Sequence, residues 1–236
     1  MQKNGVETLL MGGQACVFYG AAEFSRDLDL LALVNAQNLI RLRQAVDELE
    51  AQVIAVPPFD EQFLQAGHAV HFRCGRADVA GLRIDVMARL RGVDGFEQLW
   101  RRRTVIEVGE QIVHLLGLED LVRAKKTQRD KDWPMIRRLA EQNYLEHRGE
   151  PTPERVRFWM RELRTPELLI EAAARWPRQA QDEAVRRSAV AGAVGGRADL
   201  VVECLELEER QERERDRLYW QPLRRELERL RHELRL

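Results

Sequence analysis

The sequence predicts a mixed α/β (α+β) core followed by an all-helical C-terminal region. Short apolar runs alternate with helical patterns over the first half of the chain, whereas helical periodicity alone continues from Leu118 onward. With 236 residues, of which 44% are hydrophobic, the chain is long enough to bury a core. We expect an α/β core over 1–116, helices that complete this core over 117–149, and a helical region of unknown role over 150–236.

Each element of the first half follows from a local pattern. Short runs of apolar or alternating residues predict strands at 6–11, 27–34, 53–56, 69–74 and 82–87. Leucine, isoleucine and valine at helical spacing predict a helix at 36–50. Short helices are also expected at 14–22 and 96–103. Gly109-Glu110 separates 104–108 from 111–115, which predicts a β-hairpin.

The second half carries helical patterns with a few interruptions. Helices are expected at 118–126, 133–143, 199–217 and 222–236, and two or three more within 154–190 with breaks near Pro166 and Pro177. The small, glycine-containing segment 191–196 is expected to be a loop. Leucines recur at positions 223, 227, 230 and 234, which is a short apolar seam, too brief to establish a coiled coil on its own. The C-terminal helices could still join the chain into a homo- or hetero-oligomer.

The amino-acid composition excludes several classes of protein. The net charge of −1, from 38 basic and 39 acidic residues, excludes a globally basic nucleic-acid-binding surface. Three widely spaced cysteines indicate free thiols in a reducing compartment. No apolar run approaches the roughly 20 residues of a membrane span, and no signal peptide is visible. We therefore expect a cytoplasmic protein with no membrane partner.

Three aspartates form the most informative pattern. Gly12-Gly13 is followed after thirteen residues by Asp27 and Asp29, whose i, i+2 spacing in a strand places both carboxylates on one face. Paired hard oxygen ligands suit Mg²⁺. Asp85 stands in another strand, and if the two strands pair, three carboxylates can hold two metal ions about 3.5–4 Å apart for phosphoryl displacement. The Gly-Gly turn before a helix offers backbone N–H groups to phosphate.

A basic segment follows the predicted core. Only four of the 38 basic residues are lysines, and three of them lie within seven residues. Lys125, Lys126 and Arg129 belong to a stretch that either faces phosphate or is an ordinary basic helix end. Asp132 is interpreted as the N-cap of the following helix. His68 and His71 form His-x-x-His without a third ligand nearby, so we expect them at a strand entry and not in a zinc site.

Taken together, residues 6–143 resemble the polymerase-β-like nucleotidyltransferase superfamily, including minimal nucleotidyltransferases of abortive-infection and toxin–antitoxin systems. The resemblance rests on the Gly-Gly turn, the Asp-hydrophobic-Asp strand and the later third aspartate. It implies that Asp27, Asp29 and Asp85 are catalytic residues that hold two Mg²⁺ ions. It also implies that the NTP substrate is bound by a further set, namely Gly12, Gly13, Arg26, Lys125, Lys126 and Arg129.

The expected activity is transfer of a nucleoside monophosphate from an NTP to an acceptor hydroxyl. The resemblance leaves the acceptor open among RNA, protein and small molecules. Arg26, directly before the first aspartate, would either bind phosphate or neutralise the site. The alternative function is a binding or regulatory module with weak or no catalysis, such as a toxin–antitoxin component.

Overall fold

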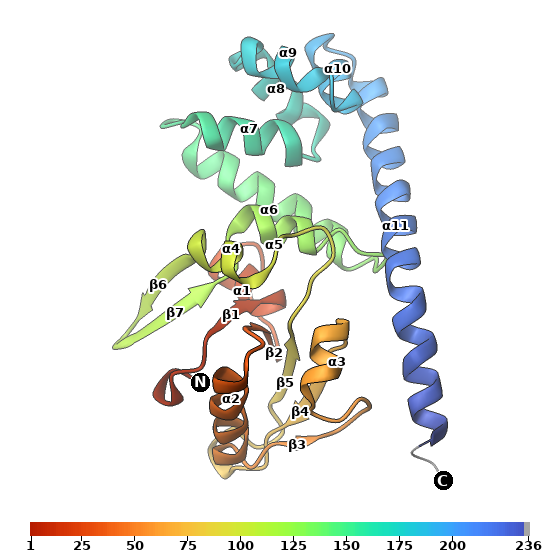
Figure 1. Cartoon of the computed structure of the whole chain (residues 1–236). Coiled ribbons are helices and arrows are strands. Elements are labelled where there is room, and N and C mark those ends of the chain that lie inside the picture. The colour runs from red at the N-terminus through yellow and green to blue at the C-terminus, as the bar shows by residue number, and fades with distance from the viewer. Residues whose placement is uncertain (234–236) are drawn as a thin grey trace. The chain divides into compact units, whose positions relative to one another are not determined.

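A seven-stranded mixed sheet with its helices makes up the first of two units in the computed structural model, which describes residues 1–233 (Figure 1). Unit 1 comprises Met1–Phe18, Ala22–Ala124 and the chain from Leu218 onward, and unit 2 comprises Tyr19–Ala21 and Lys125–Arg217. The chain therefore changes unit after Phe18, Ala21, Ala124 and Arg217, whereas the sequence predicted boundaries after residues 116 and 149. The mixed α/β class with a following helical region is confirmed.

Unit 1 holds all of the strands. The sheet order is β3-β4-β5-β2-β1-β7-β6, in which β1 pairs with β7 and β2 with β5 in parallel, and the other neighbours are antiparallel. The strands are β1 (Thr8–Met11), β2 (Asp27–Ala32), β3 (Gln52–Val53), β4 (Val70–Arg73), β5 (Arg83–Met87), β6 (Thr104–Val108) and β7 (Gln111–Leu115). The α-helices are α1 (Gly12–Phe18), α2 (Ala36–Glu48), α3 (Glu61–Ala66), α4 (Phe96–Arg101) and α5 (Leu118–Ala124), with 3₁₀ turns at Gln2–Asn4 and Ala77–Val79.

Unit 2 is helical. It contains α6 (Asp132–His147), α7 (Pro153–Glu162), α8 (Pro166–Arg175), α9 (Pro177–Ala184), α10 (Ser188–Val194) and the first part of α11 (Ala198–Glu233). Pro166 and Pro177 each open a helix, where a missing N–H costs no hydrogen bond, so the breaks predicted at these prolines are confirmed. No helix within residues 1–233 is long and apolar enough to cross a membrane.

Three predicted elements are wrong. The strand expected at 53–56 is reduced to Gln52–Val53, and the unpredicted helix α3 follows, capped by the Asp60 side chain and ended by Gly67 at φ +106°. The loop expected at 191–196 is largely helix α10, because its small residues allow close packing: a Cβ on Gly192 would lie 3.2 Å from Val201 Cγ2. The helices expected at 199–217 and 222–236 are one helix, α11, which continues through Pro222 to Glu233. Residues 234–236, including Leu234 of the leucine seam, lie outside the described residues.

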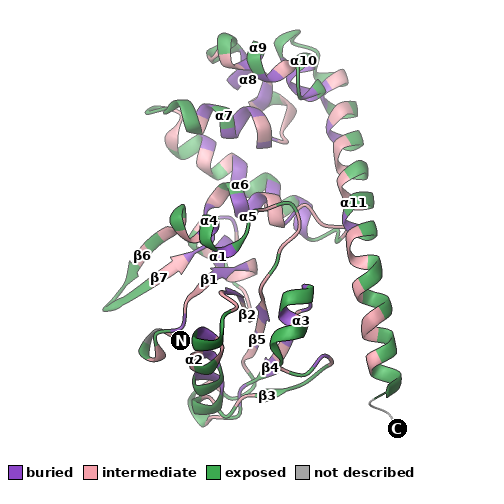
Figure 2. Ribbon diagram, in the orientation of Figure 1, coloured by how far each residue is buried: buried purple, intermediate pink, exposed green. Residues whose placement is uncertain are grey.

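One face of the sheet is apolar where β4, β5 and β2 pair, and nearer β1 both faces are buried, since Leu9 and Leu31 point away from the face of Leu30. Alternation along the strands sends Val70 and Phe72 of β4, Ile84 and Val86 of β5, and Leu30 of β2 to the same face, and all five are buried (Figure 2). The opposite face at this end of β2 and β5 carries the charged residues. Burial of the apolar set therefore determines which way the charged set points.

Aromatic packing and a hydrogen bond from the buried Tyr144 stabilise unit 2. The rings of Tyr144 and Trp159 lie edge to face with centroids 5.2 Å apart, and Trp176 packs against Trp159 at 5.1 Å. Burial and the neighbouring Glu171, which accepts the Tyr144 hydroxyl at 2.8 Å, raise the pKa of Tyr144 to about 12. These contacts join α6, α7 and α8 around one core.

Truncation of Ile84 tests the assignment of the buried face. Ile84 is 0% exposed, whereas Ile112 on β7 is 47% exposed. We expect Ile84→Ala to lower the free energy of unfolding by about 3 kcal/mol, because it leaves a cavity. The matched variant Ile112→Ala should lower it by about 0.5 kcal/mol or less. Urea unfolding followed by circular dichroism measures both, and equal losses would contradict the assignment.

Candidate functional site

Strand register brings the three predicted aspartates to one face of unit 1. Strand β5 pairs with β2 in parallel, and Asp29 lies directly opposite Asp85 while Asp27 lies opposite Arg83. Across the other side of β5, His71 of β4 lies opposite Asp85. Because directly opposed residues on neighbouring strands point to the same face, a single surface carries three carboxylates, a guanidinium and an imidazole.

The Gly-Gly turn is shaped by close approach to Asp29. Gly12 has φ +66°, and a Cβ there would lie 1.8 Å from Asp29 Oδ2. A Cβ on Gly13 would lie 2.4 Å from Ser25 Oγ, and the Gly13 N–H donates to Asp29 Oδ2 at 3.4 Å. Only glycine fits at these positions without displacing a neighbour. Gly12 and Asp29, which are distant in the sequence, are therefore in direct contact in the fold.

Asp85 is held by two basic residues. Arg83 donates from Nε to Oδ1 at 2.9 Å and from Nη2 to Oδ2 at 3.0 Å, and His71 Nδ1 lies 2.8 Å from Oδ1. Burial raises the pKa of Asp85, but the hydrogen bonds with His71 and Arg83 lower it by more, so the pKa lies below its ordinary value. The hydrogen bond with Asp85, together with the charges of Asp27 and Asp29, raises the pKa of Arg83.

Sequence reasoning missed Arg83 and the role of His71. Arg83 stands two residues before Asp85, so the i, i+2 rule already placed both on one face. The contact of His71 depends on the pairing of β4 with β5, which no local pattern shows. The other histidine of the pair, His68, is buried and pairs with Glu226 at 2.8 Å.

The donor set suits a hard cation only in part. Within residues 1–233 no three His, Cys, Asp or Glu side chains are already grouped to hold a metal ion. Asp27 and Asp29 offer carboxylate oxygens on one face, which is the chemistry Mg²⁺ prefers. Both oxygens of Asp85 accept hydrogen bonds from Arg83, so Asp85 would have to exchange this partner before it bound a metal ion.

The predicted phosphate-binding cations belong to unit 2, and each has an acidic partner there. Lys125 Nζ lies 3.3 Å from Asp132 Oδ1, and Arg129 Nε lies 2.7 Å from Asp132 Oδ2. Lys126 Nζ lies 2.7 Å from Glu162 Oε2. The remaining predicted phosphate ligand, Arg26, is exposed in unit 1 between α1 and β2.

The interpretation of Asp132 as an N-cap is wrong. Helix α6 begins at Asp132 itself, and no side-chain cap is formed. The Asp132 carboxylate instead accepts from Thr127 Oγ1 at 2.6 Å and from the two cations. Asp132 is therefore the buried centre of the 125–132 turn, which explains the basic residues around it.

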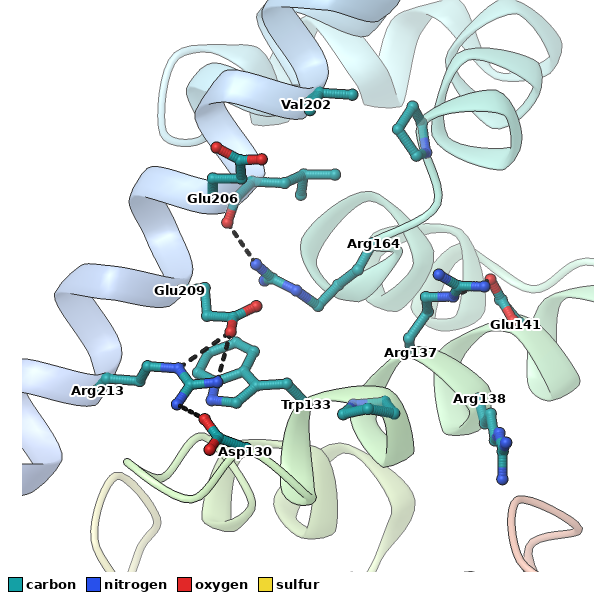
Figure 3. A pocket seen from close by; sticks show the side chains of 13 residues that line it. Asp130, Trp133, Arg137, Arg138, Glu141, Arg164, Val202, Glu206, Glu209 and Arg213 are labelled. Carbon is teal, nitrogen blue, oxygen red and sulfur yellow. Dashed lines mark hydrogen bonds and ion pairs between the residues drawn. The ribbon is translucent and has the colours of Figure 1, made fainter.

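A pocket of ≈ 670 Å³ lies within unit 2 between α6 and α11 (Figure 3). Arg213 pairs with Asp130 at 2.6 Å and with Glu209 at 2.7 Å, and Arg164 donates to the Leu205 carbonyl at 2.7 Å. The arginines that line the pocket are 137, 138, 164 and 213, and the acids are Asp130, Glu141, Glu206 and Glu209. Because these charges balance, the pocket presents no excess charge to a ligand.

Searches with the sequence find no matching family model and no matching curated protein. We therefore infer the function from strand register and side-chain contacts.

Acid unfolding tests the role of Asp132. Burial raises the pKa of Asp132, but Lys125 and the hydrogen bonds from Thr127 and Arg129 lower it by more, so the folded-state pKa lies below the unfolded value of about 3.9. The ionised carboxylate thus stabilises the fold above that value, and this contribution is lost as the pH falls through the folded-state pKa. We expect Asp132→Asn to cost about 3 kcal/mol at pH 7, and less at pH 3.

Urea unfolding at both pH values measures this difference. The exposed Asp182→Asn, also in unit 2, is the control and should change stability little at either pH. An Asp132→Asn loss that stays constant with pH would show that the charge of Asp132 does not matter.

Alanine at Gly12 tests the contact with Asp29. Gly12 at φ +66° and Gly109 at φ +60° carry the same backbone penalty for alanine, about 1–2 kcal/mol, but nothing lies within 4 Å of a Cβ on Gly109. We expect Gly12→Ala to be about 1–3 kcal/mol more destabilising than Gly109→Ala, because its Cβ overlaps the Asp29 side chain. Chemical denaturation of the two variants gives the difference, and equal losses would rule out this contact.

Proposed function

We propose that unit 1 is a Mg²⁺-dependent nucleotidyltransferase that resembles the polymerase-β-like superfamily. It would transfer a nucleoside monophosphate from an NTP to an acceptor hydroxyl on RNA, protein or a small molecule. The observation that supports this most directly is the opposition of Asp29 and Asp85 on neighbouring strands, with Asp27 on the same face and Gly12 against Asp29. This arrangement supplies carboxylates and a glycine turn within reach of one triphosphate.

The three aspartates would have different roles in an in-line displacement at the α-phosphorus. Asp27 and Asp29 would hold two Mg²⁺ ions, which when bound neutralise the triphosphate, and Asp85 would complete the second ion's ligands. Asp85 would also accept the proton of the acceptor hydroxyl, whose oxygen bonds to the α-phosphorus as pyrophosphate leaves. Gly12 and Gly13 allow a phosphate to come close to the backbone.

The basic residues are a secondary part of the proposal. Arg26, exposed beside Asp27, would contact phosphate directly. Lys125, Lys126 and Arg129 would each have to leave a carboxylate partner before they bound phosphate. The proposal therefore does not depend on these three.

One observation favours a second function. Arg83 occupies both oxygens of Asp85, so the protein neutralises its third carboxylate with its own side chain. A protein that kept this contact permanently would be a binding or regulatory module, such as a toxin–antitoxin component, with weak or no catalysis. Calorimetry of NTP binding with and without Mg²⁺ separates the two functions, because only the first requires the ion.

Transfer of label tests the activity itself. The full chain is incubated with each α-labelled NTP, Mg²⁺ and a pool containing RNA, protein and an aminoglycoside, and the products are separated by size and charge. The nucleotidyltransferase proposal expects label on one class of acceptor, and loss of transfer in EDTA.

Removal of one carboxylate gives a sharper test. We expect Asp29→Asn to reduce transfer by about 10²–10³-fold or more, the scale of losing one preorganised charge contact. Without metal, its melting temperature should be unchanged or higher, because Asp29 faces the like charge of Asp85. Asp78→Asn, an exposed site in unit 1, is the control for both measurements. A large fall in melting temperature in EDTA would make Asp29 a structural residue.

A further inference from the structure

We propose that Arg83 is an internal counter-ion that occupies the third carboxylate of the metal-free site and is exchanged for Mg²⁺ when the site is loaded. This inference rests on the proposed function, because it assigns a regulatory contact within the same site. It adds a role for a residue that the catalytic scheme does not use.

The first argument is the repulsion that the sheet creates. Asp29 and Asp85 are directly opposed on parallel neighbours, and Asp27 lies two residues from Asp29 on the same face. Like charges in this position destabilise a sheet unless a cation lies among them. Arg83, directly opposite Asp27 and hydrogen-bonded to Asp85, supplies such a cation.

The second argument is geometric. The guanidinium makes two parallel hydrogen bonds to Asp85, at 2.9 and 3.0 Å, and so covers both carboxylate oxygens. A Mg²⁺ ion that binds Asp85 needs at least one of those oxygens, so the two cations compete for the same atoms.

The third argument concerns exchange. The Arg83 side chain is 41% exposed, whereas that of Asp85 is 14% exposed. The Arg83 side chain therefore has access to water, and water can hydrate it when it separates from Asp85. His71 Nδ1, 2.8 Å from Asp85 Oδ1, remains to orient the carboxylate when the guanidinium leaves.

A matched pair of variants tests the exchange. Arg73 lies directly opposite Arg83 on β4 and is exposed, and no ion pair of Arg73 is seen among residues 1–233. Arg83→Gln removes the counter-ion, while Arg73→Gln removes an equal charge from the same face without touching Asp85. We measure Mg²⁺ affinity by calorimetry of the full chain and the melting temperature in EDTA.

We expect Arg83→Gln to bind Mg²⁺ about tenfold more tightly and to melt lower in EDTA, because the competing cation and the charge balance are both lost. Arg73→Gln should change both quantities much less. In ¹⁵N-labelled wild-type protein, the hydrogen-bonded Nε–H signal of Arg83, assigned with Arg83→Lys, should lose its protection from exchange as Mg²⁺ is added. The wild-type signal gives a result even if Arg83→Gln fails to fold.

Two results would overturn the inference in distinguishable ways. If wild type binds Mg²⁺ with the Arg83 signal unchanged, or if both glutamine variants bind it as tightly as wild type, the exchange is refuted while the proposed cation site stands. If neither wild type nor Arg83→Gln binds Mg²⁺ with or without NTP, the proposed function fails, and Arg83 is a permanent partner of Asp85.

Discussion

The parallel pairing of β2 with β5 is the constraint on which the candidate site depends. Side chains alternate along a strand, so the register that buries Ile84 and Val86 also turns Asp85 toward Asp29. A slip of one residue would move Asp85 into the apolar core and expose Ile84, at the cost of an unpaired buried charge. The hydrophobic core therefore fixes the separation of the carboxylates, and no dedicated loop is needed to bring them together.

Local patterns were sufficient for the parts of the fold that depend on nearest neighbours. The β6–β7 hairpin, the prolines that open α8 and α9, and the common face of Asp27 and Asp29 all follow from spacing alone. Helix α10 could not be predicted from spacing. A glycine in this segment suggests a loop, and the close approach of Gly192 to Val201 appears only in the folded structure. The same holds for Lys126, whose partner Glu162 lies 36 residues further along the chain.

Unit 2 shows why a cluster of charges is ambiguous in a sequence. Asp132 and Asp216 are each 2% exposed, and their carboxylates organise the 125–132 turn through Lys125, Thr127 and the backbone N–H of Gln128. Glu208 likewise accepts a hydrogen bond from Arg187, which also donates to the carbonyls of Met160 and Leu163. Removing one partner of such a buried pair strongly destabilises the fold. A run of basic residues can therefore serve folding alone. The excess of basic residues near position 125 is thus accounted for without a ligand.

The contrast between the two units bears on the choice between enzyme and regulatory module. In the Lys125–Asp132 pair the side chains are 10% and 3% exposed, whereas in the Arg83–Asp85 pair they are 41% and 14% exposed. A buried ion pair exchanges its partner at high cost, because an uncompensated charge would be left without water, while a half-exposed guanidinium can be hydrated as it leaves. The Lys125–Asp132 contact is therefore suited to permanence and the Arg83–Asp85 contact to replacement. Both proposed functions need the same fold and the same glycine turn. Under the proposed function, whether unit 1 catalyses or only binds would depend on the relative affinity of Asp85 for Arg83 and for a divalent cation.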